Sequence, residues 1–198
     1  MITPLDRSIY LASRSPRRQE LLAQIGVKFE LVDADVDESV ANNEAPRTYV
    51  ERLARAKAEA GWRQIEKNHR PHAPVLGADT TVAIDGRILG KPADDREAAQ
   101  MLAALSGRLH EVLTAVAVKH ESRLESALSV SEVRFKALTN DEIARYVATG
   151  ECHDKAGAYG IQGHAAQFVA ELRGSFSGVV GLPLYETAQL LERIGAPA

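Results

Sequence analysis

The sequence is poor in cysteine and in long apolar runs, and it has no excess of positive charge. Cys152 is the only cysteine among 198 residues, which excludes an internal disulfide and fits a reducing cytosol. No apolar run is long enough to span a bilayer, and residues 1–7 lack the apolar core of a signal peptide, so we expect a cytoplasmic protein without a membrane segment. Lys and Arg number 24 against 27 Asp and Glu, which argues against a general nucleic-acid-binding surface, so we do not expect nucleic acid as a partner.

The signatures of three enzyme classes are also missing. The sequence has no G-x-x-x-x-G-K-S/T, so it is not a P-loop nucleoside triphosphatase, and it has neither G-x-S-x-G nor H-E-x-x-H. With 45% hydrophobic residues over its length, the chain can bury an ample core. We expect residues 1–198 to form a single domain with two lobes.

The apolar patterning predicts a mixed α/β protein, because the chain opens with a strand, a helix and a second strand. Strands are expected over residues 9–12, 29–32, 75–84, 87–89, 112–118, 124–135 and 168–172. Helices are expected from Pro16 to a C-terminal glycine at Gly26, over residues 46–67, after Asp94, after Thr139 and from Leu184. Asp94 with Glu97, and Thr139 with Glu142, predict capping boxes.

The first strand–turn–helix segment carries the first sign of a function. Ser15 is a natural N-cap, and Pro16 suits the first helical position. Arg17 and Arg18 then occupy the first turn, where the helix dipole is already positive and each cation costs roughly 0.3–1 kcal/mol. One interpretation is a basic, solvated helix start. Together with Ser13, however, the free N–H groups and guanidinium groups favour a site for a polyphosphate.

A lysine and an aspartate interrupt apolar patterns further along the chain. Lys57 lies in the apolar stripe of the helix over residues 46–67, where it either snorkels along the edge of the core or points into a cleft. Asp79 lies within an almost wholly apolar strand, where an unsupported carboxylate costs several kcal/mol. It is either a structural carboxylate with its own hydrogen bonds or a functional group at a cleft. Gly77 would let a ligand or another backbone approach this strand.

Two later segments add charged groups near glycines. The Asp85-Gly86 turn would bring Lys91 back toward Asp79. The glycine-rich segment 154–163 exposes its backbone and begins with a charged pair that includes Lys155, although such a segment is often only a turn.

These charged residues together indicate metal-assisted chemistry on a polyphosphate. The cations are Arg17, Arg18, Lys57, Lys91 and Lys155, and the carboxylates are Glu38 and Asp79. Mg²⁺ prefers oxygen ligands and often binds through one or two carboxylates together with substrate phosphates. The cations would neutralise charge on the transferring phosphoryl group, and a metal or a carboxylate would ready a water.

Four motifs resemble the Maf family of nucleoside triphosphate pyrophosphatases. They are S-R-S-P-R-R-Q-E-L-L at 13–22, G-A-D-T at 77–80, G-K-P at 90–92 and D-K-A-G-A-Y-G-I-Q-G at 154–163. The resemblance covers nearly the whole chain. It implies a mixed α/β fold similar to inosine triphosphate pyrophosphatases, with two lobes around a central mixed sheet and a cleft between them. It also implies a cytoplasmic homodimer that converts a nucleoside triphosphate to the monophosphate and pyrophosphate with Mg²⁺, Mn²⁺ or Co²⁺.

The resemblance implies roles for individual positions. Asp79 matches the proton acceptor, and Arg17, Thr80 and Gln162 match the positions that mark substrate choice. We assign phosphate or substrate binding to Ser13, Ser15, Arg18, Lys57, Lys91 and Lys155, and metal binding to Glu38 and Asp79. The sequence departs from the family at Arg14, often a small residue there, which adds charge at the phosphate-binding turn.

The form of the motifs is similar to the branch of the family that acts on dTTP and UTP, so we expect a nucleotide diphosphatase of that specificity. Thr80 and Gln162 offer donors and acceptors that suit the edge of uracil or thymine, although which of them touches the base stays open. The expected reaction is attack of a water, assisted by metal and Asp79, on the α-phosphorus. Two alternatives remain: a pyrophosphatase for 7-methyl-GTP or another modified nucleotide, and a regulator of division arrest that acts through partners.

Overall fold

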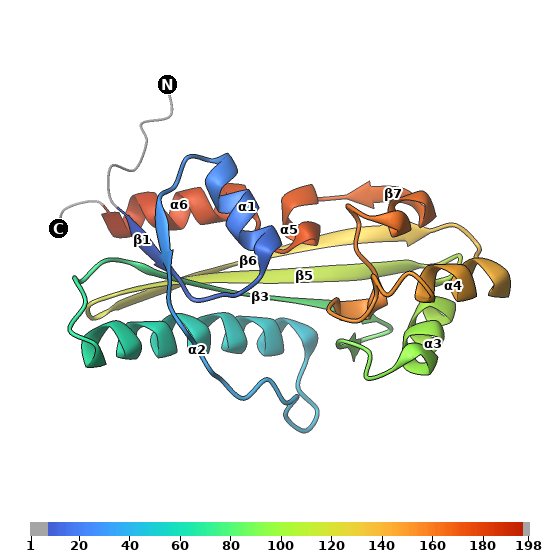
Figure 1. The fold of residues 1–198 in the computed structure, drawn as a ribbon, viewed down its shortest axis with the longest axis horizontal. Coiled ribbons are helices and arrows are strands. Elements are labelled where there is room, and N and C mark those ends of the chain that lie inside the picture. The colour runs from blue at the N-terminus through green and yellow to red at the C-terminus, as the bar shows by residue number, and fades with distance from the viewer. Residues whose placement is uncertain (1–7, 196–198) are drawn as a thin grey trace.

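One seven-stranded mixed sheet organises the computed structural model, which describes residues 8–195 (Figure 1). The strands are β1 (Ile9–Leu11), β2 (Phe29–Leu31), β3 (Val75–Ile84), β4 (Arg87–Leu89), β5 (Leu109–His120), β6 (Arg123–Phe135) and β7 (Val169–Arg173). Their order is β2-β1-β3-β5-β6-β7, and β4 pairs with β3. β1 is parallel to β2 and β3, whereas β3, β5, β6 and β7 pair antiparallel in succession. The predicted mixed α/β class is confirmed.

Helices cover both faces of this sheet. They are α1 (Pro16–Gln24), α2 (Pro46–Lys67), α3 (Asp95–Leu105), α4 (Asn140–Val147), α5 (Phe176–Val180) and α6 (Leu184–Gly195), with short 3₁₀ helices η1 (Ala156–Ala158) and η2 (His164–Phe168). The long helix α2 lies along one face, α1, α5 and α6 lie on the other, and α3 and α4 pack at one end (Figure 1). Within residues 8–195, no helix combines the length and the apolar character that a bilayer crossing requires.

Strand alternation decides which residues of β3 face which helices. Leu76 and Ala78 point to the face of α1 and α6, where they join a buried cluster with Leu22 and Leu190. Gly77 points the other way, and a Cβ added there would lie 2.4 Å from a main-chain oxygen of α2. The close approach predicted for Gly77 is therefore made by the backbone of α2.

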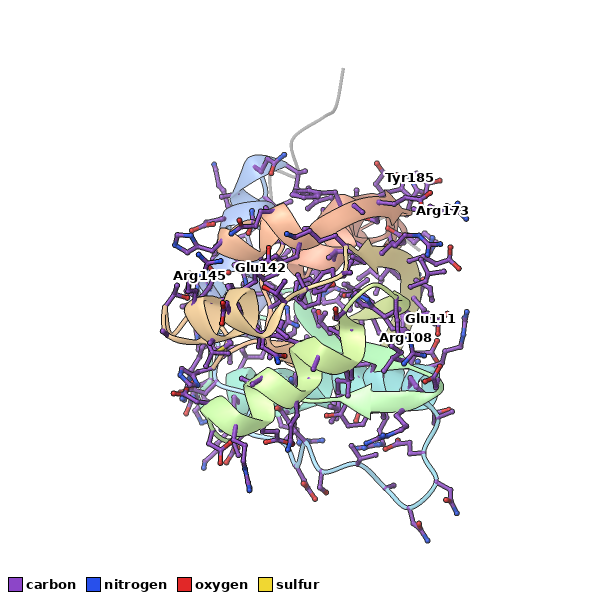
Figure 2. The ribbon with its side chains drawn as sticks, turned by 90° about the vertical axis from the view of Figure 1, so that its right-hand side faces the viewer. Arg108, Glu111, Glu142, Arg145, Arg173 and Tyr185 are labelled. Atoms are coloured by element: carbon purple, nitrogen blue, oxygen red, sulfur yellow. The ribbon has the colours of Figure 1, made fainter. Side chains whose placement is uncertain are left out.

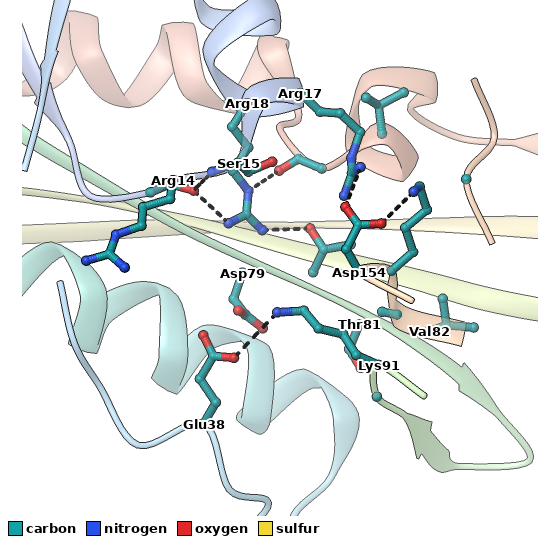
Figure 3. A pocket seen from close by; sticks show the side chains of 18 of the residues that line it. Arg14, Ser15, Arg17, Arg18, Glu38, Asp79, Thr81, Val82, Lys91 and Asp154 are labelled. Carbon is teal, nitrogen blue, oxygen red and sulfur yellow. Dashed lines mark hydrogen bonds and ion pairs between the residues drawn. The ribbon is translucent and has the colours of Figure 1, made fainter. Parts of the chain in front are cut away.

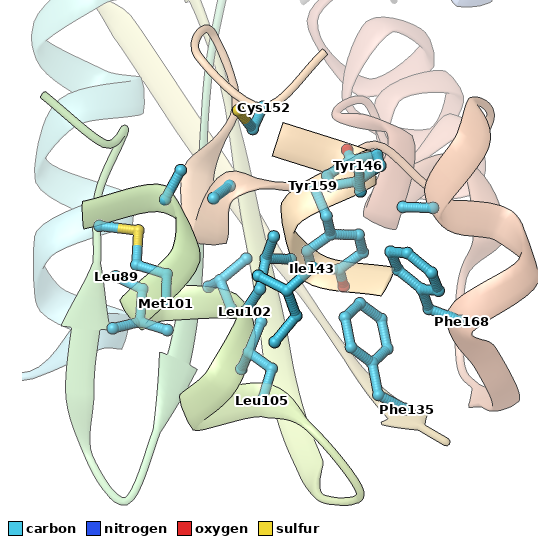
Figure 4. Close-up of a cluster of buried hydrophobic side chains, with 14 of the residues drawn as sticks. Leu89, Met101, Leu102, Leu105, Phe135, Ile143, Tyr146, Cys152, Tyr159 and Phe168 are labelled. Carbon is cyan, nitrogen blue, oxygen red and sulfur yellow. The ribbon is translucent and has the colours of Figure 1, made fainter. Parts of the chain in front are cut away.

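The end of the molecule around α3 and α4 has its own apolar cluster (Figure 4). Met101 and Leu102 of α3 pack there with Phe135 and Tyr159, so Met101 is part of the core. Seen from this end, the labelled Arg145 of α4 lies on the exposed outer side of the helix, opposite its buried residues (Figure 2).

An interruption along one edge of β3 prepares the functional site. β5 pairs with β3 along Val75 to Ala83. On the opposite edge, β1 pairs only with Val75 and Leu76, and β4 pairs only from Val82 to Ile84. Among the described residues, no strand pairs with this edge over residues 77–81. Because β3 is uncovered there, its neighbouring residues Asp79 and Thr80 can both reach one space although they point to opposite faces.

The helix ends agree with the predicted signals with two differences. Thr139 and Glu142 form the full capping box on α4. Asp94 caps α3 by accepting from the Glu97 N–H, but the Glu97 carboxylate accepts from the N–H of Ala93 instead of that of Asp94, so the box is only half formed. The short helix α5 was not predicted, since glycines at its centre and its ends resemble a loop. The division into two lobes stays a prediction.

Candidate functional site

A cavity of about 1300 Å³ opens at the uncovered edge of β3 (Figure 3). Every site residue predicted from the sequence lines it: Ser13, Ser15, Arg17, Arg18, Glu38, Lys57, Asp79, Thr80, Lys91, Lys155 and Gln162. The four sequence motifs therefore converge on one space. The backbone joins two of them directly, because the Gly157 N–H donates to the Gly90 carbonyl at 3.0 Å.

The N-terminus of α1 faces this cavity without a side-chain cap. Ser15 occupies the N-cap position and Pro16 follows it as predicted, yet the Ser15 hydroxyl makes no capping hydrogen bond. Instead, the Ser15 N–H donates to the Ser13 hydroxyl at 3.2 Å. A helix start of this kind keeps its orphan N–H groups available to an anion.

Arg18 is anchored inside the protein, which contradicts the alternative of a solvated helix start. Its guanidinium donates to Gly181 O at 2.9 Å, and to the hydroxyls of Ser13 and Thr80 at 3.2 Å each (Figure 3). Burial lowers the pKa of this guanidinium, and the charge of Asp79 partly opposes that effect. An arginine has five N–H donors, so two remain for a ligand after these three bonds.

Lys57 and Asp79 meet across the gap between α2 and β3. The Lys57 ammonium donates to Asp79 Oδ1 at 2.7 Å and lies 2.6 Å from Glu38 Oε1. Lys57 is only 8% exposed and Asp79 only 7%. Lys57 therefore points into the cavity rather than along the edge of the core, and one buried cation holds two carboxylates together. A buried charge needs such pairing to be tolerated.

Glu38 comes from the long loop before α2, and Tyr49 of α2 fixes that loop by donating its hydroxyl to Glu38 O at 3.0 Å. Burial raises the pKa of the Glu38 carboxyl, but Lys57 and the nearby Lys91 lower it more, so it lies below its usual value. Burial and the charge of Asp79 raise the pKa of Tyr49 to about 12. Glu38 is thus a carboxylate and Tyr49 a protonated hydroxyl at neutral pH.

The carboxylates of Glu38 and Asp79 form a donor set that fits a hard divalent cation. Both have an oxygen within 2.7 Å of one Lys57 nitrogen, so they lie close enough to share a ligand. Mg²⁺ commonly takes one or two carboxylates and completes its shell with water and substrate phosphates. Within residues 8–195, no group of three or more His, Cys, Asp or Glu forms a metal cage, and Glu38 and Asp79 are the residues that would hold such an ion.

Thr80 is held from behind by Thr114, its cross-strand partner on β5. Thr114 Oγ1 lies 2.7 Å from Gly178 O and 3.0 Å from Thr80 Oγ1. The single hydroxyl proton of Thr114 goes to the carbonyl, which can only accept, and Thr80 then donates to Thr114 while accepting from Arg18. The only donor of the Thr80 hydroxyl and one of its two acceptor sites are thereby used inside the protein.

The glycine-rich loop contributes an ion-pair network at the other side of the cavity. Asp154 accepts from Arg17 at 3.2 Å and from Lys155 at 2.6 Å (Figure 3). Burial raises the pKa of the Asp154 carboxyl, but these two cations lower it more, so it lies below its usual value. Lys155 also donates to the Glu151 carbonyl at 2.6 Å. This network places two cations across the cavity from Asp79.

The remaining predicted residues lie at the cavity's rim. The Lys91 side chain is 62% exposed, and its ammonium is 4.0 Å from Glu38 Oε2. The hairpin therefore returns it to the carboxylate that shares Lys57 with Asp79. Gln162 is exposed and lines the cavity. Arg14, the departure from the family pattern, is 87% exposed and pairs with Asp33 at 2.7 Å, which offsets the charge it adds.

Several residues that shape the cavity were not predicted from the sequence as site residues: Tyr49, Thr114, Glu151 and Asp154. Tyr49 could have been predicted from the sequence. It precedes Lys57 by two successive i, i+4 spacings in α2, so the two side chains share a face of the helix. Asp154 stands beside Lys155 in a motif already recognised. Thr114 gave no local signal, because its partners lie far away in the sequence. Glu151 has partners nearby in the sequence, but a glutamate next to a turn needs no special explanation and so gave no signal either.

Comparisons with known proteins found relatives of this chain in sequence and in structure. The chain is 59% identical over 98% of its length to the "dTTP/UTP pyrophosphatase" of Aromatoleum aromaticum, and 51% identical over 98% to that of Nitrosomonas europaea, in both cases over 98% of the relative. Among solved structures, the Staphylococcus aureus Ham1 protein shows a TM-score of 0.44 at 14% identity, over 65% of this chain and 72% of that one.

The model of the family described as Maf-like protein matches residues 8–194, a span that contains all four motifs and every residue placed around the cavity. The chain therefore belongs to the Maf-like protein family.

Proposed function

We propose that this protein is a dTTP/UTP pyrophosphatase, which hydrolyses these nucleotides to the monophosphate and pyrophosphate. The observation that carries the proposal is the convergence of Arg17, Arg18 and Lys155 with the Lys57–Asp79 pair around one cavity. Support comes from relatives that are more than 50% identical over nearly the full length and are named for this activity. The cavity exceeds the roughly 300–1,000 Å³ of common ligand pockets, which suits a nucleotide with its ions.

In the proposed mechanism, the cations hold the triphosphate and Asp79 handles the proton. Water attacks the α-phosphorus, an oxygen–phosphorus bond forms, and the bond to the bridging oxygen of the β-phosphate breaks to release pyrophosphate. Asp79 accepts the proton of the attacking water, and the Lys57 ammonium at 2.7 Å holds its carboxylate in place. Arg17, Arg18 and Lys155 neutralise the charge that develops on the phosphate oxygens.

Glu38 and Asp79 would hold the divalent cation, with Mg²⁺, Mn²⁺ and Co²⁺ as candidates. When bound, such an ion supplies positive charge to the phosphate oxygens and helps to activate the nucleophile. The homodimer and the cytoplasmic location that the resemblance implies stay predictions.

The substrate is tested by measuring pyrophosphate and phosphate release from dTTP, UTP, CTP, GTP and 7-methyl-GTP with Mg²⁺ or Mn²⁺. We expect pyrophosphate chiefly from dTTP and UTP. Release from 7-methyl-GTP alone would preserve the reaction and overturn the specificity. Absence of release from every nucleotide would contradict the proposal and favour a protein that acts through partners.

The role of Asp79 is tested by Asp79→Asn, which removes the proton acceptor while keeping the size of the side chain. We expect turnover of dTTP to fall by about a hundredfold or more. The matched control is Asp85→Asn in the β3–β4 turn outside the cavity, where Asn-Gly suits the turn and activity should stay at the wild-type level. Wild-type turnover in Asp79→Asn, with an unchanged circular dichroism spectrum, would show that another group takes the proton.

A further inference from the structure

Gln162 is the group best placed to read the base, yet it lies on an exposed loop. The Thr80 hydroxyl is used by Arg18 and Thr114, whereas Gln162 makes no side-chain hydrogen bond within the described part of the chain. Its amide offers donors and an acceptor to the cavity that it lines. A mobile amide would discriminate poorly between bases, because ordering it on binding costs free energy. The loop therefore needs a support.

Glu151 supplies that support through both oxygens of its carboxylate. Oε2 accepts from the main-chain N–H of His164 at 2.8 Å, and Oε1 accepts from the Tyr146 hydroxyl at 2.9 Å. The Tyr146 oxygen in turn accepts from the N–H of Gly160 at 3.3 Å. The two main-chain groups that bracket Gln162 are thus tied to a single carboxylate and its tyrosine.

Tyr146, which joins Glu151 to Gly160, is itself held in the protein core. It is 3% exposed in the apolar cluster around α4. Burial, together with the hydrogen bond to Glu151, raises the pKa of its hydroxyl well above the ordinary value. The hydroxyl therefore stays protonated at neutral pH and can donate to Glu151.

The glycines of the loop make room for these contacts. A Cβ on Gly163 would lie 2.2 Å from Glu151 Oε2, and one on Gly160 would lie 2.6 Å from Cε of Lys155. A side chain at either position would displace the Glu151 carboxylate or the end of the Lys155 side chain, so the two glycines leave the space that these contacts occupy. This is a packing reason for a segment that otherwise resembles an ordinary flexible turn.

Glu151 also contacts the phosphate side of the site, but through a different atom. Its main-chain carbonyl accepts from the Lys155 ammonium at 2.6 Å. A substitution of the Glu151 side chain keeps this carbonyl. The support of Gln162 can therefore be removed while the contact to Lys155 remains.

We propose that Glu151 is a positioning residue that holds Gln162 against the pyrimidine base of the substrate. The proposal deepens the proposed function and rests on it, since it takes the ligand to be dTTP or UTP. Glu151 does not itself touch the reacting atoms. It sets substrate affinity and choice through the loop, and it leaves phosphate binding to the cations.

Glu151→Ala tests the proposal through a comparison of base-dependent and base-independent binding. We expect KM for dTTP to rise about tenfold, the effect of about one lost hydrogen bond to the base, with little change in kcat. The inhibition constant of inorganic tripolyphosphate, which has no base, should stay within about twofold. Glu66→Ala, an exposed glutamate on α2 outside the cavity, is the matched control and should change neither value. An unchanged KM for dTTP, or a parallel rise of both constants, would overturn the proposal.

Tyr146→Phe provides a second variant should Glu151→Ala fail to fold. It removes the hydroxyl that joins Glu151 to Gly160 and keeps the ring in the core. We expect a smaller rise in KM for dTTP, about threefold, again without a rise in the tripolyphosphate constant. Equal KM values in Tyr146→Phe and the wild type would contradict the role of the loop support.

Hydrogen exchange gives a readout that does not depend on activity. In Glu151→Ala the main-chain N–H of His164 loses its acceptor, so exchange across residues 160–164 should become at least about tenfold faster than in the wild type. Unchanged protection would overturn the proposal even in an active enzyme. Absence of pyrophosphate release by the wild type would instead count against the proposed function, while the exchange measurement would still decide whether Glu151 holds the loop.

Discussion

Arg18 lines the cavity and is connected to the protein core by a chain of hydroxyl groups. Its guanidinium contacts Thr80, Thr80 contacts Thr114, and Thr114 contacts the Gly178 carbonyl of α5. Thr114 is only 1% exposed and cannot touch a ligand. Any influence it has on activity must therefore pass through Thr80 and Arg18.

Thr114→Val should weaken this chain, because valine has nearly the shape of threonine but can neither accept from Thr80 nor donate to Gly178. We expect kcat/KM for dTTP to fall about fivefold to tenfold, and the free energy of unfolding to fall by about 1–3 kcal/mol, since the Gly178 carbonyl is left without a partner. Steady-state kinetics and urea unfolding measure the two effects. Thr114→Ser keeps the hydroxyl and should retain most of the activity. A loss in Thr114→Ser as large as in Thr114→Val would show that the methyl packing matters and the hydroxyl does not.

The contrast between Lys57 and Thr114 shows which site residues a sequence can reveal. Lys57 and Asp79 could be predicted because a charge within an apolar stripe or strand requires an explanation. Thr114 could not, because threonine is common in strands and its partners Thr80 and Gly178 are 34 and 64 residues away. The type of a residue can be judged locally, whereas its partner is fixed only by the register of β3 against β5.

At the scale of elements, the site depends on how closely α2 packs on β3. The sequence showed a permissive glycine at position 77 but not what would approach it. In the structure, a Cβ on Gly77 would lie 2.4 Å from Ala54 O and 2.5 Å from Ala58 N, both main-chain atoms of α2. Since Lys57 lies between these two residues, the same close packing brings its ammonium to Asp79.

Gly77→Ala should therefore push α2 away from the sheet. We expect the free energy of unfolding to fall by about 1–3 kcal/mol, as for other overpacked core positions, and kcat for dTTP to fall because Lys57 moves from Asp79. Urea unfolding and initial rates would measure both effects. The control is Gly90→Ala, where no atom lies within 4 Å of the added Cβ and the stability should stay within about 0.5 kcal/mol of the wild type. Wild-type stability in Gly77→Ala would mean that α2 can shift without cost.

Element boundaries show a second limit of the sequence. The long strands were predicted, but β5 begins at Leu109 instead of residue 112, because pairing with β6 extends it past its apolar run. The short helix α5 was missed entirely. The Ser175 hydroxyl caps the helix by accepting from the N–H of Gly178. The Gly178 carbonyl accepts from Thr114, and the carbonyl of Gly181, just after the helix, accepts from Arg18. Tertiary contacts therefore hold a segment that its own glycines would not keep helical.

At the scale of the whole molecule, the structure buries a histidine, His110, that the site does not use. His110 of β5 is 2% exposed and lies against Phe135 and Tyr159 at the far end of the sheet. Its Nε2 is 2.9 Å from the Tyr159 hydroxyl. Burial lowers the pKa of His110 from 6.5 to about 4. The imidazole is therefore neutral in the folded protein across the physiological range, and unfolding allows it to take up a proton.

This difference predicts a loss of stability in mild acid. Below pH 6.5 His110 binds a proton in the unfolded chain but stays neutral in the folded protein. The free energy of unfolding therefore falls as the pH falls from about 6.5 toward 4, and the loss levels off below that pH because the folded protein then binds the proton too. Between pH 7.5 and pH 5 the contribution of this one group is roughly 2 kcal/mol. The carboxyl groups of Glu44 and Glu142, whose pKa values are lowered to about 2, lose their contribution only in stronger acid.

His110→Gln isolates this contribution, because glutamine keeps a polar group near the Tyr159 hydroxyl and does not titrate. The variant will differ from the wild type by some constant amount at every pH, since glutamine packs differently in the core. The informative quantity is how that difference in the free energy of unfolding changes with pH, because the contributions of all titratable groups that the two proteins share cancel. Urea unfolding at pH 7.5, 6 and 5 should show the wild type losing roughly 2 kcal/mol more than His110→Gln. Parallel losses in the two proteins would mean that His110 takes up its proton over the same pH range in the folded and the unfolded protein, so that its burial among aromatic rings does not keep it neutral.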